Sequence, residues 1–280
     1  MRTMTLTALA MLAFAGNSLL CRMALKTTAI DPASFTTLRL VSGALVLWLL
    51  VRVRERRGTY AADGNWPSAL ALFAYAAGFS FAYVSLSAAT GALLLFGAVQ
   101  ATMIGHGLWA GERFQRLQWV GLVLALVGLL GLLLPGLSAP PLAGALLMLG
   151  AGVAWGIYSL RGKGAGDATR VTAGNFLRAA PLAALLSVAM LHSASVDSAG
   201  VWYALASGAF ASGMGYAIWY TALPALKATQ AATVQLSVPV IAAAGGVVLL
   251  AEPLSLRLVL ASVAILGGIA LVILEKPAVR

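Results

Sequence analysis

The chain has 280 residues, of which 61% are hydrophobic and 9% are charged, and its formal net charge is +10. A soluble domain carries about a quarter charged residues, so this composition excludes a water-soluble monomer, and the high hydrophobicity excludes a disordered chain. The single cysteine, Cys21, and two distant histidines, His106 and His192, exclude a disulfide framework and show no metal-ligand spacing. We therefore expect a polytopic membrane protein with no metal and no cofactor.

Long stretches without charged side chains predict membrane-spanning helices, each of which needs about 20 apolar residues. The stretch from Gly64 to Gly111 has 48 residues and the stretch from Leu117 to Leu160 has 44, so each is long enough for two helices. Turn-forming residues divide both stretches, at 87–90 and at 135–141. In chain order, the ten predicted spans are 5–25, 32–51, 66–87, 90–110, 117–134, 141–161, 169–191, 199–222, 228–250 and 257–274.

The distribution of Lys and Arg predicts how these spans are oriented. With a cytoplasmic N-terminus, 13 of the 18 basic residues fall on the cytoplasmic side, whereas only Lys26 and Arg257 fall on the opposite side. Both termini are therefore expected in the cytoplasm. The positive charge then reflects topology and contact with anionic membrane lipids, and not the binding of nucleic acid.

The two halves of the sequence resemble each other at offsets of 137 to 140 residues. Each half holds five predicted spans, an odd number, so the second half enters the membrane in the opposite orientation. We therefore predict an all-α membrane protein of two inverted five-helix repeats, 1–135 and 136–280, that form one transmembrane domain. A substrate site near the middle of the membrane is typical of this architecture. The repetition also favours keeping the first span, for which a cleaved signal peptide is the alternative. The matched residues include Arg22 with Arg161, Leu38-Arg39 with Leu177-Arg178, and Gly111-Glu112 with Ala251-Glu252.

Two five-helix repeats, an Arg early in the second helix of each, and a Gly/Ala-Glu pair ending the fourth resemble the EamA-type drug/metabolite transporter superfamily. The aromatic-rich third, sixth and eighth spans look most like its YddG-type aromatic amino-acid exporters. One departure is Gln100, which stands where the second half has the mid-span Pro239. The resemblance implies a monomeric secondary transporter, not an enzyme, in the bacterial inner membrane. Its cavity would be lined by the first, third, fourth, sixth, eighth and ninth spans.

Aromatic and amide side chains inside the spans are the candidate substrate-binding residues. Aromatic faces bind flat rings and cations, and a buried amide must face protein or a wet cavity. Core filling and hydrogen bonding between helices are the structural alternatives. The candidates are Asn17, Tyr75, Phe79, Tyr83, Gln100, Trp155, Tyr158, Tyr216, Trp219 and Gln235.

Four charged residues have predicted structural roles. Arg39 and Arg178 occupy matching positions inside spans, where we expect them to reach the interface or cap a neighbouring helix; binding of a substrate carboxylate is the secondary hypothesis. Glu112 and Glu252 close the fourth and ninth spans, and we expect each to accept hydrogen bonds at the start of the next helix. No Asp or Glu lies mid-span, which argues against a proton relay and favours a facilitator.

The sequence therefore predicts export of aromatic amino acids and related ring compounds, including planar cations, by alternating access without ATP. Nucleotide-sugars or other phosphorylated metabolites are the alternative, although a dianion needs several cavity cations and only the two mid-span arginines qualify. Small neutral amino acids are a further alternative. A membrane-embedded lipid-processing enzyme or a passive pore is also considered, but clustered nucleophiles are absent from the sequence.

Overall fold

The computed structural model describes residues 2–54, 63–111, 113–134, 136, 139–162, 166–222, 225–226 and 234–274. Every regular element within these ranges is helical, which confirms the predicted all-helical class. Glu112 lies outside the described residues, and so does the start of the predicted span 228–250.

The helices follow the predicted spans closely. In the first half they are α1 (Arg2–Thr27), α2 (Pro32–Arg54), α3 (Trp66–Tyr83), α4 (Ala88–Trp109) and α5 (Arg116–Leu133). In the second half they are α6 (Leu142–Gly162), α7 (Ala168–Ala189), η1 (Leu191–Ser193), α8 (Ser198–Ala206), η2 (Ser207–Met214), α9 (Gly215–Ala222), α11 (Ser237–Leu250) and α12 (Leu256–Leu274).

Seven of these helices are long and apolar enough to cross a membrane: α1, α2, α4, α5, α6, α7 and α12. The helix α11 is apolar but shorter. The predicted span 199–222 is present as one helical run, α8–η2–α9, whose middle part η2 is a π-helix. The chain is therefore a multi-pass helical membrane protein, and the count of ten spans stays a prediction.

The break between α3 and α4 lies earlier than predicted. The helix α3 ends at Tyr83, not at residue 87, and α4 begins at Ala88, not at residue 90. Ser87 is the N-cap of α4 because its hydroxyl accepts a hydrogen bond from the Thr90 amide at 3.2 Å. The sequence Ser-Ala-Ala-Thr therefore starts a helix and does not form the turn itself.

Pro239 is the third residue of α11, which a turn at Leu236 separates from the helical residues 234–235. The start of the predicted span 228–250 lies outside the described residues, so the mid-span place of Pro239 stays a prediction. The first-turn amides of a helix have no partner within the helix, so a proline is tolerated there without a kink.

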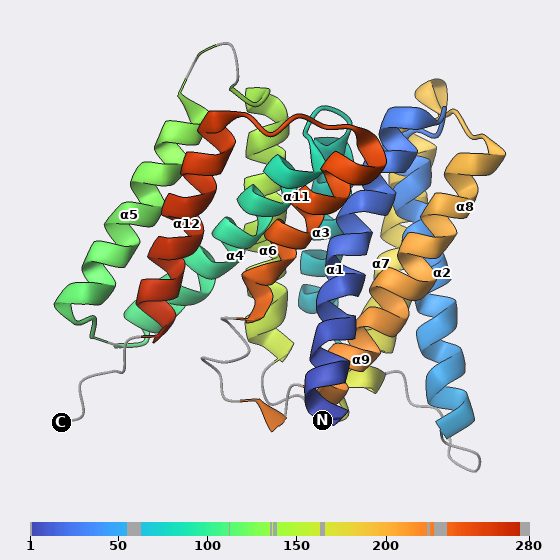
Figure 1. The fold of residues 1–280 in the computed structure, drawn as a ribbon. Coiled ribbons are helices and arrows are strands. Elements are labelled where there is room, and N and C mark those ends of the chain that lie inside the picture. Colours follow the sequence, from blue (N-terminus) through green and yellow to red (C-terminus); the bar gives the residue numbers. More distant parts are fainter. Residues whose placement is uncertain are drawn as a thin grey trace.

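The helices pack side by side with the α5–α12 pair at one edge of the bundle, and the start of α1 and the end of α12 lie at the same end (Figure 1). Glycines hold this pair close: a Cβ on Gly121 would fall 2.5 Å from the carbonyl oxygen of Gly268. The helix α1 packs against α9 and α11, α6 packs against α3 and α4, and α2 packs against α7. The centre of the bundle, where these contacts meet, contains most of the buried aromatic side chains.

Asp31 connects the start of α2 to the segment before α8. Its carboxylate accepts hydrogen bonds from the amides of Ala33 and Ser34, both at 2.9 Å, and from the Ser195 amide at 3.1 Å. Partial burial raises the pKa of Asp31, but the hydrogen bonds from Ser34, Ser195 and Ala33 outweigh it and hold the pKa below its usual value.

We predict that Asp31→Ala lowers the free energy of unfolding by about 1–2 kcal/mol, the usual effect of removing an N-cap. A carboxylate with a lowered folded-state pKa stabilises the protein above its unfolded pKa of about 4, and this contribution disappears as the pH falls further. The difference in thermal unfolding between wild type and variant, measured in detergent, should therefore shrink between about pH 5 and pH 3. The matched control is Asp197→Ala, because Asp197 precedes α8 without a side-chain cap; an equal loss in the control would contradict the capping role.

Candidate functional site

A narrow cavity lies in the middle of the bundle, between helices of both halves. The side chains around it come from α1, α3, α4, α6 and α9. They are Phe14, Asn17, Ser18, Tyr75, Phe79, Leu95, Phe96, Trp155 and Tyr216. The space they leave is about 20 Å³, roughly what one water molecule needs. The aromatic rings therefore almost fill the cavity, and a ring-sized ligand requires them to move apart.

Aromatic rings from three helices form a continuous wall of this cavity. The Trp155 ring lies 4.8 Å from that of Tyr75 and 5.0 Å from that of Tyr216, measured between centroids. Phe79 extends the wall along α3, 5.4 Å from Tyr75. These separations are those of favourable aromatic pairs, so a flat ring inserted among them would find the same kind of contact.

A chain of hydrogen bonds forms the polar end of the cavity. The Ser207 hydroxyl donates to the Asn17 side-chain oxygen at 2.6 Å, and the Asn17 side-chain nitrogen donates to the Tyr75 hydroxyl oxygen at 3.2 Å. Arg39 donates to the same Tyr75 oxygen at 2.8 Å and to the Ser212 hydroxyl at 3.2 Å. The network thus joins α1, α2, α3 and η2 around one tyrosine hydroxyl.

Arg39 is the charged member of this network and is fully buried, with 1% of its surface exposed. Its guanidinium lies 5.1 Å from the Tyr75 ring centroid and 4.9 Å from that of Phe79, both of which line the cavity. The prediction that Arg39 reaches the interface or caps a helix is wrong, because its guanidinium is buried and donates to the side chains of Tyr75 and Ser212. Its terminal nitrogen Nη1 has no hydrogen-bond partner.

The π-helix η2 places two serines on the same network. Ser207 and Ser212 are five residues apart, and in an α-helix they would point about 140° away from each other. The wider π turn, with its i→i+5 hydrogen bonds, brings such residues nearly into line. Gly208 lies between them, and a Cβ there would collide with the Arg39 carbonyl oxygen and the Ser42 hydroxyl. The close approach of η2 to α2 therefore requires a glycine at this position.

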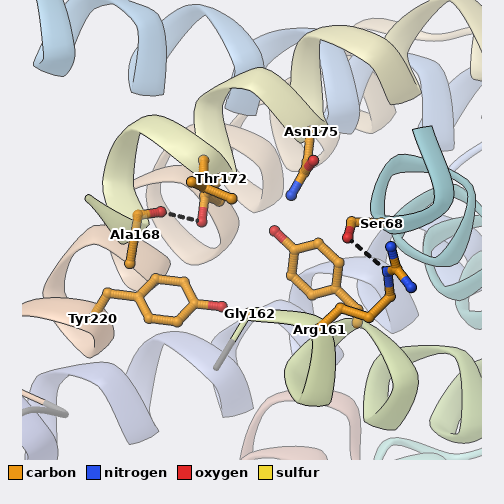
Figure 2. A pocket seen from close by; sticks show the side chains of 9 residues that line it. Ser68, Arg161, Gly162, Ala168, Thr172, Asn175 and Tyr220 are labelled. Carbon is orange, nitrogen blue, oxygen red and sulfur yellow. Dashed lines mark hydrogen bonds between the residues drawn. The ribbon is translucent and has the colours of Figure 1, made fainter. Parts of the chain in front are cut away.

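A second, more polar space lies where α6 ends and α3 and α7 begin (Figure 2). In this view Arg161 donates to the Ser68 hydroxyl at 3.1 Å, and Thr172 donates to the Ala168 carbonyl oxygen at 2.7 Å. The hydroxyl of Tyr220 points into the space (Figure 2). Tyr158 also lines this second space, and its ring stacks on that of Trp155 with 5.4 Å between the centroids. Since Trp155 lines the central cavity, each ring of this pair lines one of the two spaces.

At the opposite end of the bundle, Glu252 connects three helices. Its carboxylate forms an ion pair with Arg22 at 2.8 Å and accepts a hydrogen bond from the Ala88 amide at 2.7 Å. The prediction that Glu252 binds the start of the next helix is wrong: it caps α4, whereas the Ser255 hydroxyl accepts from the Leu258 amide at the start of α12. The sequence repeat could not reveal this, because the helix that Glu252 caps belongs to the other half.

Five of the ten predicted binding residues line the central cavity: Asn17, Tyr75, Phe79, Trp155 and Tyr216. Tyr158 lines the second space. Tyr83, Gln100 and Trp219 are buried outside both, and Gln235 is half-buried. Whether any of them contacts substrate stays a prediction.

The two repeat-related arginines have different environments. Arg178 donates to the carbonyl oxygens of Asp63 and Gly174, at 3.0 and 2.9 Å. These carbonyls belong to its own helix α7 and to the segment before α3, and not to the end of a neighbouring helix as predicted. Arg178 therefore connects α7 to the segment before α3.

Four cavity residues were not among the candidates: Phe14, Ser18, Leu95 and Phe96. Two of them could have been predicted from their spacing to a candidate residue, because side chains three or four residues apart lie on the same helix face. Phe14 precedes Asn17 by three residues, and Phe96 precedes Gln100 by four. Among the described residues, no three His, Cys, Asp or Glu side chains are placed to hold a metal ion.

Comparison with known proteins gives consistent results. The sequence model of the EamA-like transporter family matches residues 1–134 and 142–274. An uncharacterised protein of Pseudomonas aeruginosa is 62% identical over 275 residues, which cover 98% of this chain and 96% of that protein. One solved crystal structure has the same fold, with a TM-score of 0.67 and 21% sequence identity over 96% of both chains.

We predict that Glu252→Gln lowers the free energy of unfolding by about 2–3 kcal/mol, because it leaves the nearly buried Arg22 guanidinium without its counter-ion. The double variant with Arg22→Gln should lose less than the sum of the two single losses, since the two groups interact directly. Thermal unfolding in detergent measures both.

The matched control for this pair is Lys26→Gln. The Lys26 ammonium lies 3.9 Å from the same carboxylate but is 37% exposed, so its loss should cost less than about 0.5 kcal/mol. Strict additivity of the Arg22 and Glu252 losses would refute the direct interaction.

Proposed function

Because this chain belongs to the EamA-like transporter family, we propose that it is a secondary transporter that exports aromatic amino acids and related small ring-bearing metabolites. It works across the bacterial inner membrane by alternating access and without ATP. The observation that carries the proposal is the central cavity, whose aromatic wall is formed by Tyr75 from the first half and by Trp155 and Tyr216 from the second.

The packing of the helices supports two inverted halves in this proposal. In two related halves, α1 corresponds to α6, α3 to α9 and α4 to α11. The contacts of α1 with α9 and α11 then correspond to the contacts of α6 with α3 and α4. The same correspondence maps the α5–α12 and α2–α7 pairs onto themselves. The two ranges matched by the family model, 1–134 and 142–274, agree with this division. The proposal therefore includes ten spans, and the distribution of Lys and Arg favours both termini in the cytoplasm.

With both termini in the cytoplasm, the cavity is closed both from the cytoplasmic side and from the outer side. The Arg161 contacts with Ser68 and Asn65 lie on the cytoplasmic side, and the Glu252 contacts with Arg22 and Ala88 lie on the outer side. Alternating access requires one set to open while the other stays closed. Arg22 and Arg161 are the residues that the repeat matches, so each half supplies one such contact.

The composition of the cavity favours ring compounds over phosphorylated metabolites. A phosphate dianion is usually held by several Lys or Arg side chains, but Arg39 is the one cation in contact with the cavity wall among the described residues. The lining is otherwise aromatic and apolar, apart from Asn17 and Ser18.

We predict saturable flux of labelled tryptophan or phenylalanine into liposomes that contain the purified protein. Other aromatic amino acids should compete, and an imposed pH gradient should leave the rate unchanged, because none of the acidic residues in the sequence lies mid-span to carry a proton. Empty liposomes are the control. Rapid flux of threonine or a sugar phosphate without any aromatic flux would overturn the proposed substrate class.

We predict that Trp155→Ala weakens the apparent affinity for aromatic substrates about three- to tenfold, because it removes the central ring of the aromatic wall. Competition by small neutral amino acids should change less. Trp202→Ala is the matched control, since Trp202 lies on α8 outside the cavity and is 71% exposed. Equal effects of both variants on aromatic selectivity would argue against binding at this wall.

A further inference from the structure

We infer that the polar end of the central cavity binds a carboxylate group of the substrate, with the Arg39 guanidinium as its counter-charge. The inference rests on the proposed function in that ring compounds enter this cavity, and it narrows the substrate class. Ring-bearing carboxylates are selected, whereas ring-bearing cations are rejected. The planar cations that were predicted from the sequence as substrates are therefore not substrates.

The first argument is that Arg39 has no acidic partner. Its described contacts are with Tyr75, Phe79 and Ser212, all of them uncharged. Three acidic residues of the described ranges pair with other cations: Glu252 with Arg22, Asp63 with Arg170 and Asp167 with Arg54. The other two, Asp31 and Asp197, precede α2 and α8 and have no described contact with Arg39. Burying a charge without a counter-ion is costly, so the free protein keeps an uncompensated positive charge behind the cavity wall.

The second argument is that the network around Tyr75 holds more hydrogen-bond donors than acceptors. The Tyr75 oxygen accepts from both Asn17 and Arg39, and no acceptor for its own proton is found in the described part of the chain. The buried Nη1 of Arg39 and the buried hydroxyl of Ser18, which lines the cavity, also have no partner. A buried donor without an acceptor is destabilising. A carboxylate accepts several hydrogen bonds and donates none, and it is the group that would satisfy these donors together.

The third argument concerns where the carboxylate would lie. Asn17 and Tyr75 both line the cavity, and the Arg39 guanidinium lies against the Tyr75 and Phe79 rings that line it too. The aromatic wall begins at the Tyr75 ring itself, with Trp155 4.8 Å away. A ligand whose carboxylate is joined to its ring by a short linker would therefore place each group against matching chemistry.

The repeat-related Arg178 shows what a purely structural arginine looks like in this fold. It binds two main-chain carbonyl oxygens outside the cavity. Arg178 is therefore a matched control for Arg39, because it occupies the repeat-related position of the other half.

The test measures binding directly, so that it does not depend on transport. Purified full-length protein in detergent is heated with indole-3-propionate, tryptophan or tryptamine, which share the ring but differ in charge. Ligands that bind the folded state raise the unfolding temperature. We expect indole-3-propionate and tryptophan to raise it, and tryptamine to bind at least about tenfold more weakly. Equal stabilisation by tryptamine and indole-3-propionate overturns the inference.

Variants assign the preference to Arg39. Arg39→Gln should abolish the preference for the carboxylate, Arg39→Lys should retain part of it, and Arg178→Gln should leave it unchanged. If Arg39→Gln does not fold, Tyr75→Phe replaces it: this variant keeps the ring and removes the hydroxyl, and it should reduce the preference severalfold. A preference that survives in the folded Arg39→Gln or Tyr75→Phe protein contradicts the inference. Carboxylate-selective binding without any flux would instead refute the proposed transport and leave the inference standing.

Discussion

The bilayer provides no water to its interior, so every polar group that the helices carry into it must be satisfied by another part of the protein. Arg39 is the extreme case, since a charged side chain inside a membrane is among the most expensive groups to bury. Its environment reduces this cost in three ways: by two aromatic faces, by the Tyr75 hydroxyl and by the Ser212 hydroxyl. The hydrogen-bond network that includes Arg39 joins four elements, α1, α2, α3 and η2.

The π-helix η2 follows from the same constraint. Two serines five residues apart must reach Asn17 and Arg39, and a regular α-helix cannot direct both to one side. The backbone also has to approach α2 closely enough to exclude any side chain at position 208. Irregular backbone is found at membrane depth where it is surrounded by protein, and here it serves to satisfy a buried cation. The second half is therefore not a copy of the first, although its helices follow the same order.

The sequence predicted the all-helical class and the positions of most helices, which depend on composition, and it failed where a contact depends on which face of a helix turns inward. Tyr75, Phe79 and Tyr83 recur every four residues, but this spacing drifts by about 40° at each step, so Phe79 still lines the cavity and Tyr83 does not. Repetition likewise suggested one role for Arg39 and Arg178. The carbonyl oxygen of Asp63 is available to Arg178, whereas Arg39 faces η2. Two residues at matching positions of a sequence repeat can therefore have different neighbours in the structure.

In the proposed transporter, two inverted halves would allow two access states of similar energy, but a symmetric site would suit a symmetric ligand. An amino acid is not symmetric: it has a ring at one end and charged groups at the other. In this protein the asymmetry lies at the centre, where the first half supplies Arg39, Tyr75 and Asn17 and the second half supplies Trp155 and Tyr216. In the proposed transporter these side chains would make the site asymmetric, although the helices around them pack in corresponding pairs. The same reasoning explains why the conspicuous repeat-matched residues, Arg22 and Arg161, lie at the two ends of the bundle and not in the cavity.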